Sequence, residues 1–402
     1  MNNNRLIINL SSEEAEIAVL SKNKQVESLD LMINGISKGS VIDNDSFLSS
    51  FQDPKFLRII NTYDFEDILV GISPSVISTA TEKNTIFDSQ QVKAINEDDT
   101  SLMQHELSEI KDDITLIHSY TLGFILDGKD IVSNPLGMHA RKFETYKLKV
   151  FVESNISKAL KNLLDDIGFN CPLSIVSNTL AKSLILVDEE NRDFGCYYLN
   201  VGIDVTELSI IHKNKVIYMG AIPVGQHNFI NDIALTLNIN KKDSKILVDK
   251  FGTITPELIK DKETINITTK TGQEERISNK KIGAIMRERA HELLNIAKKY
   301  FEENTNNKLS INRLVISGPG TKYEGFESLS KYIFQFFVYS KNKENIVSND
   351  MFCLSNFDRN FKDLRLNIEQ LSKKKFIEKE IEKNTTAMKD KIKKIFNFSL
   401  GG

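Results

Sequence analysis

The residues best suited to contact a small ligand lie in a glycine-bearing turn in the last third of the chain. An apolar run at residues 314–316 leads into Gly318, Pro319 and Gly320, and a helix signal follows at residues 326–329. Because glycine has no Cβ, the backbone of such a turn can approach a flat or phosphorylated ligand. By itself the pattern is also typical of a tight turn without a ligand, so its meaning depends on other segments.

Two further strand–turn segments fall where a nucleotide site split between two halves of a protein would need them. The first, residues 9–14, contains Ser11 and Ser12, and the second, residues 199–208, contains Gly202 and Thr206. Both segments lack the residues that hydrolysis of a nucleotide requires. The pattern therefore favours binding over turnover at these turns, if they contact a nucleotide at all.

Strands and helices that alternate along the chain are expected to position these turns. Repetition of strands followed by helices is typical of an α/β chain, here with two related halves. The apolar cluster at residues 334–339 predicts a core strand whose edge could pair with another subunit. We expect strands at residues 5–10, 15–20, 67–73, 115–120, 145–152 and 174–176, a hairpin of 195–211 with 214–222, helices at 157–167, 228–237 and 278–301, and helix-forming spacing within 88–113.

Composition limits the class of protein. A chain of 402 residues with 40% apolar and 27% charged residues is expected to form two to four compact units. The net charge of −3 argues against nucleic acid as a partner. The three cysteines and six histidines are scattered, with no pair at metal-ligand spacing. The chain has neither a secretory signal nor an apolar run of about 20 residues, so we expect a cytosolic protein.

The C-terminal residues have the pattern of a basic amphipathic helix. On a helical wheel of residues 388–400 the apolar side chains share one face and lysines flank it. Such a helix can lie in the interface of an anionic membrane, and about 13 residues are too short to cross it. A solvated end and a helix packed on its own domain are the alternatives. The expected membrane-contacting residues are Met388, Lys391, Ile392, Lys394, Ile395 and Phe396.

Together these segments resemble the FtsA family of bacterial cell-division proteins, part of the actin, Hsp70 and sugar-kinase superfamily. The similarity runs in order over about residues 5–340, and residues 341–385 match by position alone. The most specific blocks are 120–151 and 230–234. The other segments that carry the resemblance are residues 37–43, 69–73, 222–225, 289–293 and the turn at 318–320.

The resemblance implies an α/β, actin-like (ribonuclease H-like) fold with two lobes and a relocated subdomain inserted into the first. In the family's terms the expected parts are subdomain 1A at 1–85 and 154–180, the inserted 1C at 86–153, 2A at 181–224 and 306–345, 2B at 225–305, a return to 1A at 346–365, a charged linker at 366–386 and the membrane-targeting helix at 387–402.

The resemblance also assigns a nucleotide site, in which several positions have lost their usual chemistry. Asn9 and Asn200 stand where the family has aspartates, and asparagine is no anionic anchor for metal-bound water. Glu14 replaces a lysine, a sign change worth several kcal/mol at about 4 Å and an effective dielectric of about 20. Ile203 and Asp204 replace glycines, and Asn178 stands where a glutamate would orient water. The positions implied to contact nucleotide are Ser11, Ser12, Gly202, Thr206, Gly225, Gly318, Pro319 and Gly320.

These substitutions predict a scaffold rather than an enzyme, with no catalytic residue and no metal site. The resemblance implies filaments of the chain itself, binding of the FtsZ C-terminal peptide through 225–305, recruitment of later divisome membrane proteins through 86–153, and a place on the cytoplasmic face of the inner membrane at the division septum. No cofactor is required, and ATP with Mg²⁺ is the ligand that the family would supply. An active actin-like ATPase and a pilus-assembly actin homologue are the alternatives, distinguished by ATP turnover and by deleting 386–402.

Overall fold

The fold divides into two compact units, which are described one at a time. The computed structural model describes residues 4–11, 13–37, 40–72, 77–101, 113–129, 131–168, 171–255, 257, 264–305, 309–341 and 350–366. The first unit comprises residues 1–72, 76–177 and 358–402, and the second comprises 73–75 and 178–357. The lobes expected from the sequence change at 180/181 and 345/346, which lie three and twelve residues from the divisions at 177/178 and 357/358.

The first unit is built on a five-stranded sheet in the order β11-β6-β1-β2-β3. Its central strand β1 is antiparallel to β2 and parallel to β6, so it is covered on both edges, which fits its apolar residues 6–8 and Leu10. The strands expected at 5–10, 15–20, 67–73 and 174–176 are confirmed here, and the first two form a hairpin. The strands are β1 (Asn4–Leu10), β2 (Glu14–Ser21), β3 (Lys24–Met32), β6 (Phe65–Ile72) and β11 (Leu173–Ser177), with a small hairpin of β4 (Ile36–Ser37) and β5 (Ser40–Val41).

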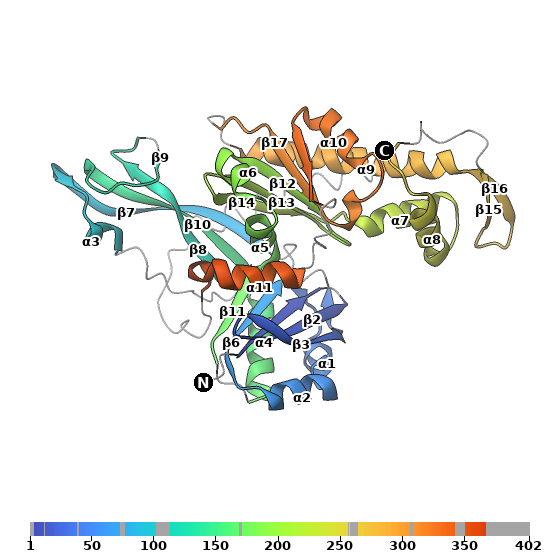
Figure 1. The fold of residues 1–402 in the computed structure, drawn as a ribbon, viewed down its shortest axis with the longest axis horizontal. Coiled ribbons are helices and arrows are strands. Elements are labelled where there is room, and N and C mark those ends of the chain that lie inside the picture. Colours follow the sequence, from blue (N-terminus) through green and yellow to red (C-terminus); the bar gives the residue numbers. More distant parts are fainter. Residues whose placement is uncertain are drawn as a thin grey trace. The chain divides into compact units, whose positions relative to one another are not determined.

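Three helices accompany this sheet, and α1 and α4 lie side by side (Figure 1). They are α1 (Asn44–Ser50), α2 (Pro54–Thr62) and α4 (Ser154–Asp166). The Asp53 side chain caps α2 by accepting from the backbone N–H of Lys55. Pro54 occupies the first helical position, where a backbone N–H would have no partner within the helix, so its absence costs no hydrogen bond. The helix expected at residues 157–167 is confirmed as α4, which begins three residues earlier.

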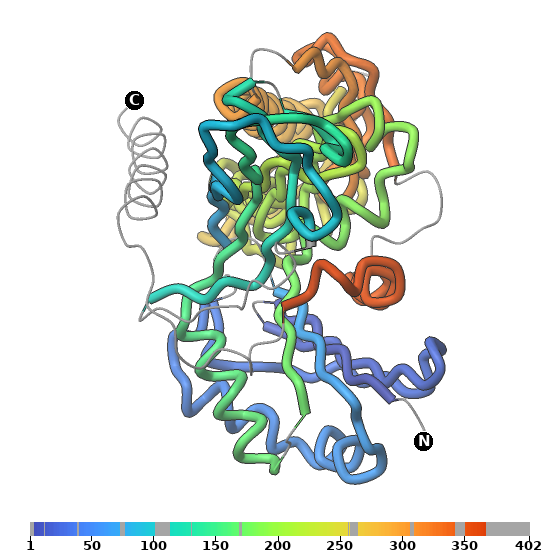
Figure 2. The backbone as a smooth tube through the Cα atoms, turned by 90° about the vertical axis from the view of Figure 1, so that its left-hand side faces the viewer, coloured from blue at the N-terminus to red at the C-terminus, as the bar shows by residue number. Residues whose placement is uncertain are grey.

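A second sheet of the first unit holds the inserted region, in the order β7-β10-β8-β9. Its strands are β7 (Ile77–Ala94), β8 (Ile114–Leu126), β9 (Ile131–Val132) and β10 (His139–Glu153), with the short helix α3 (Glu97–Ser101). Figure 2 shows that β10 continues directly into α4. β7 begins before residue 86 and extends through Ala94, so the start of the stretch 88–113 is strand. The helical spacing at 102–110 lies outside the described residues.

The second unit is built on a sheet in the order β14-β13-β12-β17-β18. The expected single hairpin of 195–211 with 214–222 is wrong, because the loop at 202–205 divides the first segment into two strands. The core strand expected at 334–339 is wrong in part, because Phe334 ends the helix at 326–334 and β18 begins at Phe337, which is 65% exposed. β18 is terminal in the sheet, and its pairing with another subunit stays a prediction. The strands are β12 (Cys196–Val201), β13 (Thr206–His212), β14 (Lys215–Ile222), β17 (Arg313–Ser317) and β18 (Phe337–Ser340), with a separate hairpin of β15 (Thr264–Thr268) and β16 (Glu274–Ser278).

Four helices of the second unit, at 226–236, 241–251, 279–304 and 326–334, bury apolar side chains in one large core. α9, the long helix expected from the sequence, contributes Ile282, Met286, Leu293, Leu294 and Ala297 to that core. The helix expected at 228–237 is confirmed as α7. The helices are α5 (Asn178–Ile185), α6 (Glu189–Phe194), α7 (Gln226–Thr236), α8 (Lys241–Phe251), α9 (Asn279–Asn304) and α10 (Phe326–Phe334), followed by α11 (Asp350–Asn360), which ends in the first unit.

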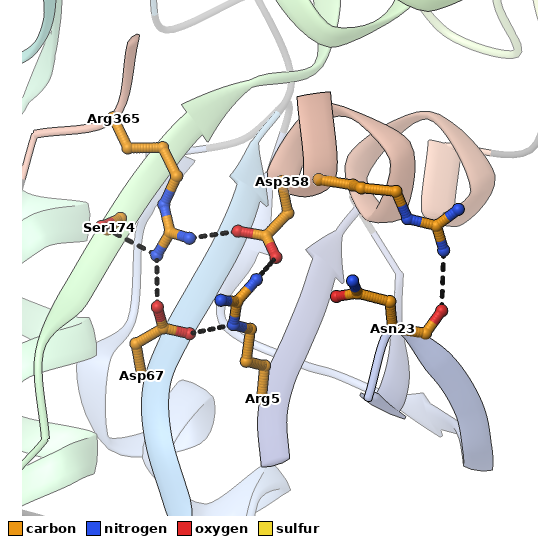
Figure 3. A network of polar contacts seen from close by, with 7 residues as sticks. Arg5, Asn23, Asp67, Ser174, Asp358 and Arg365 are labelled. Atoms are coloured by element: carbon orange, nitrogen blue, oxygen red, sulfur yellow. Dashed lines mark hydrogen bonds and ion pairs between the residues drawn. The ribbon is translucent and has the colours of Figure 1, made fainter. Parts of the chain in front are cut away.

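The segment after α11 is anchored to the first unit. Arg365 pairs with Asp358 and with Asp67, and it also donates to Ser174 on β11 (Figure 3). Arg5 completes the network through Asp358, at 2.5 Å. The Arg365 side chain is only 6% exposed. The sequence from Lys362 is rich in lysine and glutamate and predicts a solvated linker or an extended helix. Lys362 and Asp363 are exposed as that predicts, whereas the ion pairs of Arg365 bury its side chain.

No helix within the described ranges is long and apolar enough to cross a membrane.

Candidate functional site

The loop between β12 and β13 is closed by its own backbone. The N–H of Gly202 donates to Val205 O at 3.0 Å, and a Cβ on Gly202 would lie only 2.6 Å from that oxygen. Thr206 is fully buried, and its hydroxyl donates to Val224 O at 2.6 Å. Both residues that the resemblance assigns to phosphate contact thus already serve the loop's internal geometry.

Gly225 allows the chain before α7 to pack against this loop. The carbonyl of Ile203 accepts from His227 N at 2.9 Å, and a Cβ on Gly225 would lie 2.5 Å from the same oxygen. Asp204 is exposed at the loop tip, where its carboxylate contacts His227 Nδ1 at 2.8 Å. Glycine at 225 is therefore required by close backbone packing, whether or not a ligand binds.

The turn after β17 also packs against the end of β12. Gly318 has a φ of +95°, a conformation that favours glycine, and a Cβ there would lie 2.5 Å from Val201 O. A Cβ on Gly320 would lie 2.3 Å from Val201 Cγ1. Pro319 begins a single 3-10 turn, residues 319–321. The structure thus brings the expected adenosine-side turn and the expected phosphate loop together within the second unit.

Asn200 is held inward by hydrogen bonds to its neighbours. It is 3% exposed, and its Oδ1 accepts from Ser317 Oγ at 2.9 Å. Because that bond uses the Ser317 hydrogen, Ser317 Oγ accepts in turn from Tyr198 Oη, at 2.7 Å. Burial raises the pKa of Tyr198 well above its ordinary value, which keeps this donor neutral. The end of β12 and the end of β17 are thereby fixed to each other.

An ion-pair cluster lies beneath the same strands. Lys182 Nζ on α5 lies 2.9 Å from Glu207 Oε1 and 2.8 Å from Asp350 Oδ1. Asn178, at the start of α5, donates to Asp350 Oδ2 at 3.2 Å. Lys182 and Glu207 side chains are 6% and 7% exposed. Buried charges of this kind persist only when they are paired, so the cluster links α5, β13 and the start of α11.

The protonation of the cluster follows from its charges. Burial by itself lowers the pKa of the Lys182 ammonium, but the carboxylates of Asp350 and Glu207 outweigh burial and raise that pKa. Burial raises the pKa of Glu207 more than the attraction of Lys182 lowers it. One ammonium and two carboxylates leave an excess negative charge, which explains why Lys182 stays charged while Glu207 gives up its charge more readily.

The corresponding loop of the first unit repeats part of this arrangement. Asn9 is 4% exposed, and its Nδ2 donates to Glu16 Oε2 at 2.8 Å. Ser11 closes the turn locally, because its hydroxyl donates to Glu14 O at 2.8 Å. Glu14 is exposed. Ser12 lies outside the described residues, as do all six residues expected to contact a membrane.

Among the described residues of these loops, the backbone N–H of Gly202 and the hydroxyls of Ser11 and Thr206 are engaged in hydrogen bonds within the chain. Asn9, Asn178 and Asn200 are all buried and carry no charge. Among the described residues no group of three or more His, Cys, Asp or Glu side chains could hold a metal ion.

Sequence reasoning missed Lys182, Glu207 and Asp350. The signal was present for the first two: Lys182 stands among apolar residues of a fully buried helix pattern, and Glu207 interrupts an apolar strand. A charge in such a position is seldom left unpaired in a core. Asp350 gave no local signal, because its partners lie far away in the sequence.

Comparison with known proteins places the chain near one family. A family model described as cell division protein FtsA matches residues 197–355. The FtsA of Borreliella burgdorferi is 22% identical over 331 residues, which cover 80% of this chain and 79% of that protein. The FtsA of Bacillus subtilis is 19% identical, over 74% and 69% of the two chains. For the FtsA of Helicobacter pylori 26695 the identity is 25%, but the match spans only 46% of that protein.

Solved structures with a similar fold confirm the expected fold class. MreB5 of Spiroplasma citri bound to ADP matches with a TM-score of 0.54 at 12% identity, covering 90% of this chain and 97% of that one. A chain of the PilM–PilN type IV pilus biogenesis complex matches with a TM-score of 0.54 at 10% identity, covering 89% and 97%. At these identities the likeness shows the actin-like fold alone.

Proposed function

We propose, on the premise that the chain is an FtsA-like cell-division protein with an actin-like fold, that it works as a scaffold and not as an ATPase. In this proposal it links FtsZ filaments to the cytoplasmic face of the inner membrane at the septum and recruits later divisome proteins. The proposal rests on one observation: polar groups of the candidate nucleotide loops are hydrogen-bonded to neighbouring residues of the chain. Asn9 and Asn200, at the two positions where the family has aspartates, are buried and hydrogen-bonded to their own neighbours.

The absence of charge at these positions supports binding without turnover. Hydrolysis needs a group that orients or deprotonates water and a metal that neutralises the phosphates. Asn178 supplies no base, and the hydroxyl of Thr206 is committed to Val224. A bound nucleotide would therefore stabilise one conformation of the protein without being hydrolysed. The scaffold works through binding contacts alone.

Attachment to the membrane is assigned to the C-terminal residues. The pattern of residues 388–400 puts an apolar face beside several lysines, the composition of a helix that lies in an anionic interface. One such helix binds weakly, but subunits joined in a filament present many of them at once, and multivalency makes the sum strong. The segment would work without a nucleotide.

The partners in this proposal are assigned to separate regions. Residues 225–305, which include the hairpin of β15 and β16, would bind the FtsZ C-terminal peptide. The sheet of β7–β10 would contact later divisome membrane proteins. Filaments of the chain itself would present both of these binding regions at regular intervals.

The test is reconstitution on vesicles that contain phosphatidylglycerol, with and without purified FtsZ. The full chain should sediment with the vesicles and carry FtsZ with it in the absence of ATP. A chain ending at residue 385 should unfold at the same temperature but lose vesicle binding. Ile395→Asp should weaken binding as the deletion does, whereas Lys391→Arg keeps the charge and should bind normally.

Two results would contradict the proposal. Vesicle binding by the truncated chain that equals that of the full chain would remove the tail from the mechanism. ATP turnover with Mg²⁺ that is lost on Gly320→Val would instead support an active actin-like ATPase.

A further inference from the structure

The actin-like fold implies a nucleotide bound with a divalent cation, and the second unit does not fit that cation. Hard cations such as Mg²⁺ take oxygen ligands, mostly carboxylates and water. The buried carboxylate nearest to Asn200 is that of Glu207, its register partner on β13. Glu207 Oε1 accepts from Lys182 Nζ at 2.9 Å, whereas Glu207 Oε2 is buried without a hydrogen-bond partner among the described residues. An ammonium of the chain itself therefore already lies against this carboxylate, at one of its two oxygens.

Asp350 strengthens that assignment. Its Oδ1 lies 2.8 Å from the same ammonium, while its Oδ2 accepts from Asn178, the residue that stands where the family has glutamate. Both oxygens are thus used within the second unit. Asn200 offers no substitute ligand, because its Oδ1 is engaged by Ser317 and carries no charge.

A divalent ion beside Glu207 would also be repelled. An ion bound to this carboxylate would lie within a few ångströms of the Lys182 ammonium, in surroundings where burial weakens screening. The carboxylates of Asp350 and Glu207 keep that ammonium charged, so it does not make room by losing its proton. Lysine and metal are therefore mutually exclusive at this place.

We infer that Lys182 is the resident cation of this half of the site: its ammonium supplies, permanently, the positive charge that a metal would bring to the β12–β13 loop. The role is one of positioning. Lys182 neutralises Glu207 and Asp350, and through them it holds the start of α5 and the start of α11 against the strands that carry Asn200. By this inference the second unit contributes no metal ligand beside Asn200 to any adenine nucleotide that the protein binds. The inference rests on the proposed loss of hydrolysis, and it extends that proposal to a metal-independent site.

The first experiment needs no variant. Binding of ATP to the full chain is measured by titration calorimetry, once with excess Mg²⁺ and once with excess EDTA. Affinities that agree within about threefold, or no binding in either buffer, support the inference. An affinity that is tenfold or more higher with Mg²⁺ would overturn it, because a metal would then have a place in the site.

The second experiment tests the charge of Lys182 through thermal unfolding of the full chain. Lys182→Met should lower the midpoint substantially, because it leaves two carboxylates without their cation. Adding Glu207→Gln to that variant should recover at least half of the loss, because it removes one of the stranded charges. Lys298→Met is the matched control: Lys298 is a lysine of the same unit whose Nζ donates to the carbonyl of Ile333, at 2.9 Å, and Glu207→Gln should not improve it.

A loss in Lys182→Met no larger than in the control, or no recovery in the double variant, would refute the role. These readouts do not involve vesicles or FtsZ. Failure of the tether reconstitution would therefore leave them unchanged, and the two proposals can fail separately.

Discussion

Asn200 lies directly opposite Glu207 in the antiparallel register of β12 and β13. The same relationship recurs in the first unit, where Asn9 lies opposite Glu16 across β1 and β2. In both hairpins an uncharged amide is the last residue but one of the first strand, and a carboxylate lies opposite it on the second. The amides are buried and hydrogen-bonded, so the shape of each hairpin is kept while the charge at its first strand is absent.

A carboxylate at position 200 should destabilise the second unit. Asn200→Asp would place a charge beside Glu207 in a cluster that already has one carboxylate in excess, so we expect a loss of about 1–3 kcal/mol in the free energy of unfolding at pH 7. Urea denaturation at pH 7 and pH 5 measures this loss, which should shrink at pH 5 as a carboxylate takes up a proton. Asn266→Asp, on the exposed face of β15, is the control and should change stability by less than about 0.5 kcal/mol. An unchanged or more stable Asn200→Asp variant would contradict the account of the cluster.

Position 318, in the turn after β17, should not tolerate a side chain. Gly318→Ala combines a φ of +95° with a Cβ 2.5 Å from Val201 O, so the backbone must move, and we expect a loss of about 3 kcal/mol or more. Gly128 has a φ of +70°, but a Cβ there would meet nothing within 4 Å, and Gly128→Ala should cost only about 1 kcal/mol. Thermal unfolding of the two variants compares them. Equal losses would mean that the close approach to β12 does not matter.

His118 should make stability depend on pH. Its Nδ1 donates to Leu364 O at 2.7 Å and its Nε2 accepts from Ser177 N at 3.1 Å, so the neutral ring is required. Burial, with the nearby charge of Arg365, lowers the pKa of His118 to about 4 although the Leu364 bond opposes the change. Since the unfolded chain takes up a proton near pH 6.5 and the folded chain does not, this contribution is complete above pH 6.5 and is lost as the pH falls towards 4.

At pH 5 the expected loss is about 2 kcal/mol relative to neutral pH. Urea titrations at pH 7, 6 and 5 measure the slope, and His118→Gln should flatten it while lowering stability at neutral pH. A wild-type slope that survives in the variant would assign the pH dependence to other groups.

The network in Figure 3 should hold the segment after α11 in place. Arg365→Met leaves Asp67 and Asp358, which is 2% exposed, to share Arg5 as their cation. Because removing one partner of a buried pair costs up to about 3–5 kcal/mol, local release of the segment should become easier. Limited proteolysis followed by mass spectrometry should show faster cleavage near residue 361.

Lys331→Met is the matched control for this prediction. Lys331 pairs with Glu327 on the surface of α10, with half of its side chain exposed, so its removal should cost at most about 0.5 kcal/mol. Cleavage near residue 361 that is no faster in Arg365→Met than in this control would mean that apolar packing, and not the ion pairs, anchors the segment.

Much of the fold follows from local patterns in the sequence. Apolar runs such as 5–10 and 314–316 predict buried strands, and the spacing of Ile282, Met286 and Leu293 predicts the long helix α9, because side-chain direction repeats every two residues in a strand and about every 3.6 in a helix. The glycine turn at 318–320 and the two asparagines were also readable directly. The division of 195–211 into two strands was not, since the loop at Gly202–Val205 is only four residues long.

The tertiary structure alone decided which charged groups meet. Lys182, Glu207 and Asp350 belong to three elements that are distant in the sequence, and no periodicity predicts that one ammonium will face two carboxylates. The same holds for Arg365, whose stretch is polar enough to suggest a solvated tail but whose partners Asp67 and Asp358 bury it. Local sequence sets which face of an element is apolar, whereas an ion pair depends on where two separate elements are packed, and only the folded chain contains that information.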